Sequence, residues 1–437
     1  MPSFHGQRRL VLLTATVVVC LLLSACGGGP KSIKIGVLLD SSGDLGVYGA
    51  PMRDAVNLAA YQINQAGGLL KGKQVEVVYQ DSATDPSVAV KAAEQLVKGD
   101  KVKAIIGSTA SGVTLQVAKS VTVPAQVVLM SPSATSPEIT SLQDNDFVFR
   151  TVVSDAAQGV VLARLANEKS YAIVAVVYIN NAYGRGLAQV FKDSFDKLGK
   201  GAVVMIPHES GQTDFTDELN KVREAGAKAV VCISYPETAT PLLEQALRRG
   251  LAVKYLFADG LKAQSMFDTL ASNALEGSFG TAPGAKGGSG VDAFQRLFLN
   301  QYGKSNSAFG SSYESSDAAK LYSQFIHDTY PGASSDPYLG ESYDAFVLLA
   351  LAIEKAGAYD GVALRDALRE VANPPGVKIG PADVAKALEL IRNGQDINYE
   401  GAAGPEDFDQ FGDVQNTIEV WAIVGGAVVS TGRFEFP

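Results

Sequence analysis

Residues 102–114 read VKAIIGSTASGVT and predict a strand, a polar turn and a helix in succession. The run 103–106 is short, apolar and rich in β-branched residues, which is typical of a buried strand. Gly107 ends this run, and the next residues are small and rich in hydroxyl groups. In open α/β sheets, ligands bind beside such turns at the carboxyl ends of strands. Backbone N–H groups at a helix N-terminus, with the Ser111 hydroxyl beside them, suit a carboxylate, although a serine here is by itself more typical of a helix cap.

The alternation of strand and helix continues outward from this stretch. Strands are predicted at 33–39 and 75–79 before it and at 126–130 after it, with amphipathic helices between them. The short connections favour a parallel, doubly wound sheet. After residue 155 the pattern repeats, and its predicted strands are 173–178, 202–206, 229–233 and 255–258. We therefore expect an α/β fold with two Rossmann-like lobes in tandem.

The C-terminal third of the chain reads mainly as helix. Helices are predicted at 291–302, 316–330, 343–356, 361–371 and 381–392. The segment 418–430 contains two apolar runs around Gly425-Gly426, which predicts a β-hairpin with a tight turn.

The first 30 residues read as a targeting segment. Arg8 and Arg9 precede an apolar run at 10–23, which is too short to span a membrane as a helix. Leu23-Ser24-Ala25-Cys26 then resembles the bacterial lipoprotein box, in which lipid is attached to the cysteine and the chain is cut before it. This predicts a signal peptide at 1–25, a lipidated tether at 26–30 and a lipid anchor in a bacterial membrane, outside the cytoplasm.

Composition excludes several classes of function. Loss of the two arginines changes the formal charge from −9 to −11, which argues against nucleic acid as a partner. The chain has three histidines, so a His-based metal or catalytic site is not expected. Cys232 lies in an apolar strand pattern and is expected to be a core residue. The acidic group Asp407, Asp409 and Asp413 lacks the oxygen-ligand pattern of a calcium loop and is expected to be a solvated turn.

From Ile33 to Val429 the chain resembles the solute-binding proteins of branched-chain amino-acid ABC transporters, the leucine/isoleucine/valine-binding type. The matching segments, in order, are IKIGVLLDSSGDLGVYG, INQAGGLLKG, YQDSATDP, KVKAIIGSTASG, LMSPSATSPEIT, FVFRT, YGRGL, DFTDEL and SYDAFVLLALAIEKAG. The resemblance implies a type I periplasmic-binding fold, with two lobes joined by three crossing strands and a ligand enclosed between them. It also implies delivery of that ligand to an ABC permease in the membrane, without catalysis and without a cofactor.

The resemblance also implies lobe boundaries. Lobe one would comprise 31–154 and 283–415, and lobe two would comprise 155–282 and 416–437. The chain is longer than a compact family member, and the extra length falls at 294–336 and 373–403. The sequence does not place these insertions.

The family recognises the two charges of a free amino acid, and its binding residues match residues of this chain. On lobe one, Ser111 and Thr135 would donate to the ligand carboxylate. Ser133 and Ala134 belong to the same turn, in which the carbonyl of Ser133 would face the ammonium. The expected residues of lobe two are Tyr183 and Asp259, and Asp259 would be the acidic partner of the ammonium. Tyr48, in the first loop of lobe one, would contribute an aromatic edge to the side-chain pocket.

One departure from the family pattern leaves the ligand open. Where some members place a binding tyrosine, this chain has Ser234 followed by Tyr235. Either Tyr235 takes that role or the ammonium loses a partner. The alternative ligands are an amide, urea or a small aromatic or aliphatic carboxylic acid, and a receptor domain of the same fold is a further reading. No G-x-S-x-G or Walker motif supports an enzyme.

Overall fold

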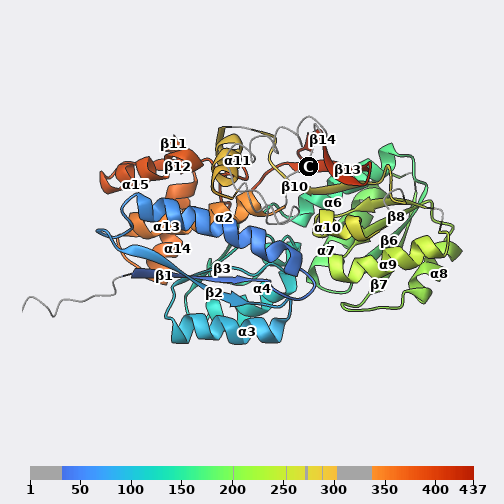
Figure 1. The fold of residues 1–437 in the computed structure, drawn as a ribbon, viewed down its shortest axis with the longest axis horizontal. Coiled ribbons are helices and arrows are strands. Elements are labelled where there is room, and N and C mark those ends of the chain that lie inside the picture. Colours follow the sequence, from blue (N-terminus) through green and yellow to red (C-terminus); the bar gives the residue numbers. More distant parts are fainter. Residues whose placement is uncertain (1–31, 200, 252, 271–273, 288, 303–336) are drawn as a thin grey trace, which may run out of the picture.

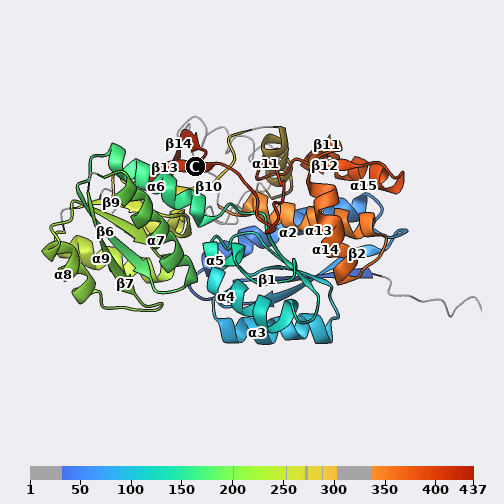
Figure 2. The ribbon, with the colours of Figure 1, turned by 180° about the vertical axis from the view of Figure 1, so that it is seen from behind.

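The computed structural model describes residues 32–199, 201–251, 253–270, 274–287, 289–302 and 337–437, which form two α/β lobes side by side (Figures 1 and 2). The predicted signal peptide, Cys26, the tether and the predicted helix at 316–330 lie outside the described residues. Within the described residues, no helix has both the length and the apolar character needed to cross a membrane.

The first lobe is built on a five-stranded parallel sheet with the order β2-β1-β3-β4-β5. Its strands are β1 (Ser32–Leu39), β2 (Gln74–Asp81), β3 (Ala104–Gly107), β4 (Val128–Ser131) and β5 (Val148–Arg150). Its helices are α2 (Gly46–Gln65), α3 (Pro86–Glu94), α4 (Ser111–Val117) and α5 (Pro137–Thr140), and π-helical segments at Gln95–Gly99 and Ala118–Thr122 extend α3 and α4. Helices cover both faces of this sheet, so β3 and β4 are buried along their whole length.

The second lobe contains a seven-stranded sheet with the order β14-β13-β10-β9-β8-β6-β7. Its strands are β6 (Ile173–Ile179), β7 (Ala202–His208), β8 (Ala229–Ile233), β9 (Lys254–Phe257), β10 (Phe279–Pro283), β13 (Ile418–Val424) and β14 (Ala427–Glu435). The first five are parallel, and β13 joins β10 in antiparallel register. Its helices are α6 (Asp155–Glu168), α7 (Ala182–Lys197), α8 (Thr216–Glu224), α9 (Pro236–Arg248), a 3₁₀ turn η3 (Asp259–Leu261) and α10 (Gln264–Thr269).

Most of the C-terminal helices return to the first lobe. They are α11 (Ser289–Tyr302), α13 (Leu339–Ala356), α14 (Gly361–Ala372) and α15 (Val384–Arg392), with a 3₁₀ turn η4 at Pro381–Asp383. Helix α13 packs against α2 and α14 and touches β3, and it is buried on nearly every side. The predicted insertion at 373–403 contains α15 and a small parallel sheet of β11 (Val377–Ile379) and β12 (Ile397–Tyr399).

The predicted α/β class, the tandem sheets and the terminal hairpin are confirmed, with element ends displaced by a few residues. Strands β5, β10, β11 and β12 were not predicted, because three are only three residues long and β10 contains glycine and proline. Cys232 is fully buried in β8, as expected of a core residue. Pro283, where the sequence places the start of the second segment of lobe one, is the last residue of β10 in the second sheet.

Candidate ligand-binding site

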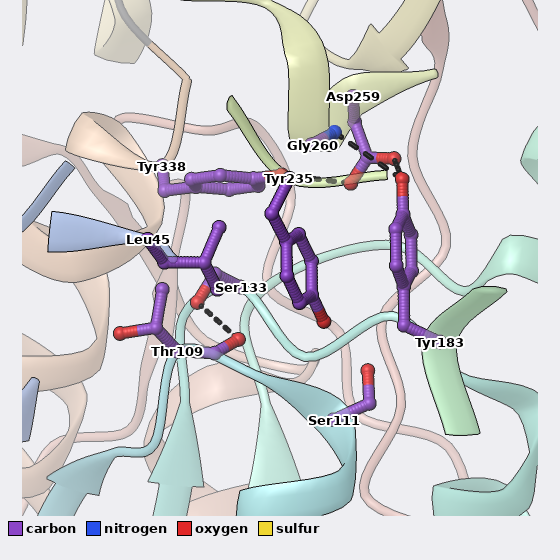
Figure 3. Close-up of a pocket in the computed structure, with 9 residues that line it drawn as sticks. All are labelled: Leu45, Thr109, Ser111, Ser133, Tyr183, Tyr235, Asp259, Gly260 and Tyr338. Atoms are coloured by element: carbon purple, nitrogen blue, oxygen red, sulfur yellow. Dashed lines mark hydrogen bonds between the residues drawn. The ribbon is translucent and has the colours of Figure 1, made fainter. Parts of the chain in front are cut away.

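Loops from both lobes meet where their parallel strands end, and they line a small pocket between the lobes (Figure 3). The lining residues are Leu45, Thr109, Ser111, Ser133, Tyr183, Tyr235, Asp259, Gly260 and Tyr338. All nine are buried, so the two lobes are closed over the pocket. Figure 3 shows Ser111 and Thr109 on one side of the pocket and Asp259 on the opposite side.

The loop after β3 brings Ser111 to the pocket. Gly107 has a φ of 134°, and a Cβ there would lie 2.1 Å from the carbonyl oxygen of Leu38, so the turn requires glycine. Ser111 is the first residue of α4, whose cap is Ala110. The Ser111 hydroxyl therefore caps no N–H of its own helix; it accepts a hydrogen bond from the backbone N–H of Ser136, at 3.2 Å, and faces the pocket.

The turn after β4 lies directly beside that loop. Ser133 donates to the carbonyl of Thr109 at 3.0 Å, and Ser131 donates to the carbonyl of Ser108 at 2.7 Å. Ser133 lines the pocket, whereas Ala134 and Thr135 are buried and are not among the lining residues. The Thr135 side chain acts on the buried carboxyl of Asp155 and opposes the rise in the pKa of that group.

Asp259 is the centre of the opposite wall. It begins η3, directly after β9, and its carboxylate accepts hydrogen bonds from Tyr183 (2.7 Å), Tyr338 (2.7 Å) and Gln158 (3.1 Å). Burial raises the pKa of this carboxyl, and the three hydrogen bonds oppose that rise. Burial together with Asp259 raises the pKa of Tyr183 well above its usual range, so the phenol keeps its proton and acts as donor.

Aromatic rings surround the remaining space. The rings of Tyr183 and Tyr235 are stacked, with centroids 5.4 Å apart. The sequence left the role of Tyr235 open, and the structure places this residue in the lining of the pocket. The Tyr48 hydroxyl donates to the carbonyl of Gly260 at 3.1 Å, which joins the first lobe to the second. The Tyr48 ring meets Tyr338 edge to face at 5.6 Å.

Three residues at or beside the site were not singled out from the sequence. Tyr338 lies next to a polar, unpatterned stretch and has a φ of 68°, an uncommon conformation for a residue other than glycine. Gln158 and Asp155 lie in the first turn of α6, where the order Ser-Asp reads as an ordinary helix start. The available signal was their position: both follow the segment 151–154, where the chain passes from β5 of the first lobe to α6 of the second.

The expectation of a solvated acidic turn is wrong for Asp413. This residue is buried, and its carboxylate pairs with Arg150 through contacts of 2.6 and 2.7 Å. Arg150 is fully buried and also donates to the carbonyls of Ala134 (3.3 Å) and Ser136 (3.0 Å). The sequence did not reveal this pair because its members are 263 residues apart.

Comparison with known proteins identifies the family of the chain. A family model described as periplasmic binding protein matches residues 32–387. The leucine-, isoleucine-, valine-, threonine- and alanine-binding protein of Pseudomonas aeruginosa is 29% identical over 423 residues, covering 95% of this chain and 96% of that protein.

Two solved structures share the fold. The branched-chain amino acid transporter substrate-binding protein LivJ of Streptococcus pneumoniae, in complex with isoleucine, aligns with a TM-score of 0.72 at 23% identity, over 93% of this chain and 100% of that one. A solute-binding protein of an ABC transporter from R. palustris, in complex with benzoate, aligns with a TM-score of 0.70 at 18% identity, over 93% and 97%.

Proposed function

The chain belongs to the periplasmic binding protein family, and on that premise we propose that it captures an amino acid between its two lobes and delivers it to the permease of an ABC importer. The single observation that carries this proposal is that opposite walls of the pocket offer groups suited to opposite charges. One wall offers the Ser111 hydroxyl at the start of α4, and the other offers the buried carboxylate of Asp259. A zwitterion needs donors for its carboxylate and an anion for its ammonium, because both charges lose water on burial.

The residue roles proposed here follow the family pattern. Ser111 and Thr135 donate to the ligand carboxylate. Asp259 and the carbonyl of Ser133 hold the ammonium, with Tyr183 beside them. Tyr48 bounds the side-chain pocket together with Tyr235 and Tyr338, and Ala134 contributes backbone to the turn.

A simple carboxylic acid is the second candidate ligand, since the R. palustris protein was solved with benzoate. Such a ligand has no ammonium, so a buried, ionised Asp259 would face it without a counter-charge. A thermal-shift screen separates the candidates. It compares leucine, valine, threonine and alanine with the same molecules lacking the amino group, and with benzoate, acetamide and urea.

We expect at least one amino acid to raise the melting temperature and its deaminated counterpart to leave it unchanged. A ligand at about 100 times its dissociation constant adds roughly 2.7 kcal/mol to the free energy of unfolding. Stabilisation by the acids alone would overturn the amino-acid proposal and leave the carboxylic-acid candidate.

The proposed organisation retains the lobes 31–154 with 283–415 and 155–282 with 416–437, except that Pro283 belongs to the second lobe as the end of β10. Family membership places the protein outside the cytoplasm, and we propose that a lipid on Cys26 holds it to the membrane there. Replacing Cys26 with serine should shift the protein from the membrane to the soluble fraction, or block its maturation. A variant that stays on washed membranes at the wild-type level would contradict the lipid anchor.

A further inference from the structure

Hydrogen bonds between the lobes form a polar latch beside the pocket. Asp44, in the loop between β1 and α2, accepts from the hydroxyls of Ser210 and Thr238, the latter at 3.3 Å. The Thr238 hydroxyl in turn accepts from the backbone N–H of Gly211 at 3.1 Å. Leu45, the residue after Asp44, lines the pocket, so these contacts lie close to it. The name latch is used below for Asp44, Ser210, Gly211 and Thr238.

His208 lies at the base of the loop that carries the latch on the second lobe. It is the last residue of β7, its side chain is buried, and its ring meets Phe215 edge to face with centroids 5.6 Å apart. Its Nδ1 atom lies 3.1 Å from the carbonyl oxygen of Glu209. Because a carbonyl only accepts, Nδ1 carries the proton of the neutral ring. The ring is thus tied to the loop that reaches across to the first lobe.

The other ring nitrogen of His208 has no partner of its own. With the proton on Nδ1, the neutral Nε2 is an acceptor, and no described residue makes a hydrogen bond to it. Protonation turns Nε2 into a donor and brings a positive charge into this buried position, which no described residue is placed to accept. A buried cation in that state is costly, and a shift of the loop that admits water to the ring relieves the cost.

The charged groups around His208 come from three elements. Glu209 belongs to the loop itself, Glu218 to α8 and Asp44 to the first lobe. Burial lowers the pKa of His208, and the carbonyl of Glu209 together with these three carboxylates opposes that fall only in part. The closed form therefore favours the neutral ring.

We infer that His208 is a pH-sensitive switch for closure of the two lobes, in which protonation of the imidazole displaces the loop 209–213, breaks the latch and weakens ligand binding. The two arrangements of the loop are latched to Asp44 in the closed form and separated from it in the open form. This inference concerns regulation of the proposed binding site, and it rests on the proposed function only in requiring a ligand that closes the lobes.

The direction of the pH effect follows from the two forms. A solvated histidine has a pKa of about 6.5, so in the open form the ring takes up a proton below about that pH. The closed form keeps the ring neutral, so closure must expel the proton. The contribution of His208 therefore makes ligand affinity fall by up to about tenfold per pH unit below about pH 6.5. At higher pH the ring is neutral in both forms and contributes no pH dependence.

The experiment is titration calorimetry of the purified protein at about pH 7.5 and about pH 5.5, which lie on the two sides of the histidine pKa. The ligands are L-leucine, L-alanine and benzoate. The test variant is His208→Gln, whose amide does not titrate. The matched control is His327→Gln, which replaces the other histidine that follows the predicted signal peptide.

We expect the three proteins to bind with equal affinity at the higher pH. At the lower pH, His208→Gln should bind severalfold more tightly than the wild type and the control. The acids of the pocket also titrate, but all three proteins contain them, so their effect cancels in the comparison. The same pH dependence in His208→Gln and the wild type would overturn the inference.

A second measurement does not depend on how well His208→Gln folds. Nuclear magnetic resonance of the imidazole nitrogens follows the titration of His208 in the wild type, and His327→Gln assigns the signals. The pKa of His208 should be lower in the ligand-saturated protein than in the free protein, and a pKa that ligand leaves unchanged or raises would overturn the switch. Binding of benzoate but of neither amino acid would instead overturn the proposed function alone, because the pH comparison works with any of these ligands.

Discussion

Asp259 is the side chain whose environment bears most directly on the proposed ligand. Its carboxylate is buried, and donors from α6, α7 and the residue before α13 converge on it. Hydrogen bonds from Tyr183 and Tyr338, both at 2.7 Å, fix its orientation toward the pocket. An anion held in this way is ready to pair with a buried ammonium.

We therefore predict that Asp259→Asn weakens amino-acid binding strongly, because it keeps the shape and removes the counter-ion. Truncating one partner of a desolvated charge pair costs about 2 to 5 kcal/mol, which is roughly a 30-fold to several-thousand-fold loss of affinity. Ser111→Ala, the comparison variant, should cost about 1 to 3 kcal/mol, since backbone donors remain. Titration calorimetry measures both, and wild-type affinity in Asp259→Asn would refute the amino-acid reading.

The turn 131–136 is held in place by side chains that lie far from it in sequence. Arg150 at the end of β5 donates to two carbonyls of this turn, and Asp413 on the segment before β13 neutralises Arg150. The turn that carries Ser133 and Thr135 is thus held by a buried ion pair as well as by its own Ser131, whose hydroxyl accepts a hydrogen bond from the backbone N–H of Ala134 at 3.0 Å.

Asp413→Asn should lower the free energy of unfolding by about 3 to 5 kcal/mol, because it leaves the Arg150 charge buried without its counter-ion. The same variant should weaken ligand binding through the loosened turn. Asp407→Asn is the matched control, since Asp407 lies in the same segment but is exposed, and it should change stability by no more than about 0.5 kcal/mol. Urea denaturation measures both variants, and equal small effects would show that the ion pair does not hold the turn.

At the scale of the whole molecule, polar contacts join the two closed lobes around the pocket. Asp44 on the first lobe accepts hydrogen bonds from Ser210 and from Thr238, the latter at 3.3 Å. Ser136 donates across the boundary to the carbonyl of Ala182 at 3.0 Å. Two lobes joined by a few chain crossings close by hinge bending, and contacts of this kind favour the closed form.

We predict that the cognate ligand decreases the radius of gyration measured by small-angle scattering. Asp44→Ala should favour the open form and weaken binding by up to about tenfold, as expected for the loss of one or two hydrogen bonds. Asp193→Ala, on the exposed side of α7, serves as control and should match the wild type. A radius that ligand does not change would mean that the free protein is already closed.

The whole molecule also carries several buried acids, and these make its stability depend on pH. Burial raises the pKa of Asp40 to about 7, of Glu341 to about 8 and of Asp344 to about 6. Between about pH 4 and these values the folded protein binds protons that the unfolded chain has released, so the free energy of unfolding falls as pH rises. Exposed acids with a lowered pKa, such as Asp214, stabilise the folded protein at higher pH, and this contribution to the free energy of unfolding is lost below about pH 4 as they are protonated.

Ligand-free protein should therefore be more stable near pH 5 than near pH 8. Urea denaturation at the two pH values tests this, and Glu341→Gln should reduce the difference because it removes one of the titrating groups. Stability that increases steadily from pH 5 to pH 8 would contradict the assignment of protons to these buried acids.

The sequence by itself determined the architecture and one half of the site. Strand, turn and helix recur with short connections, and this local pattern predicts parallel sheets whose carboxyl ends carry the polar loops. Ser111, Ser133, Tyr183 and Asp259 lie at such ends, and the structure brings all four to one pocket.

Only the tertiary structure decided which distant side chains complete that pocket and which charges are buried. Tyr338 donates to Asp259 across 79 residues of sequence, Arg150 pairs with Asp413 across 263, and Asp155 is fully buried at the start of α6. Local periodicity records which face of an element is apolar, but it carries no information about what packs against a polar residue at its end. Whether a carboxylate is solvated, paired or left bare therefore depends on packing between segments far apart in the chain.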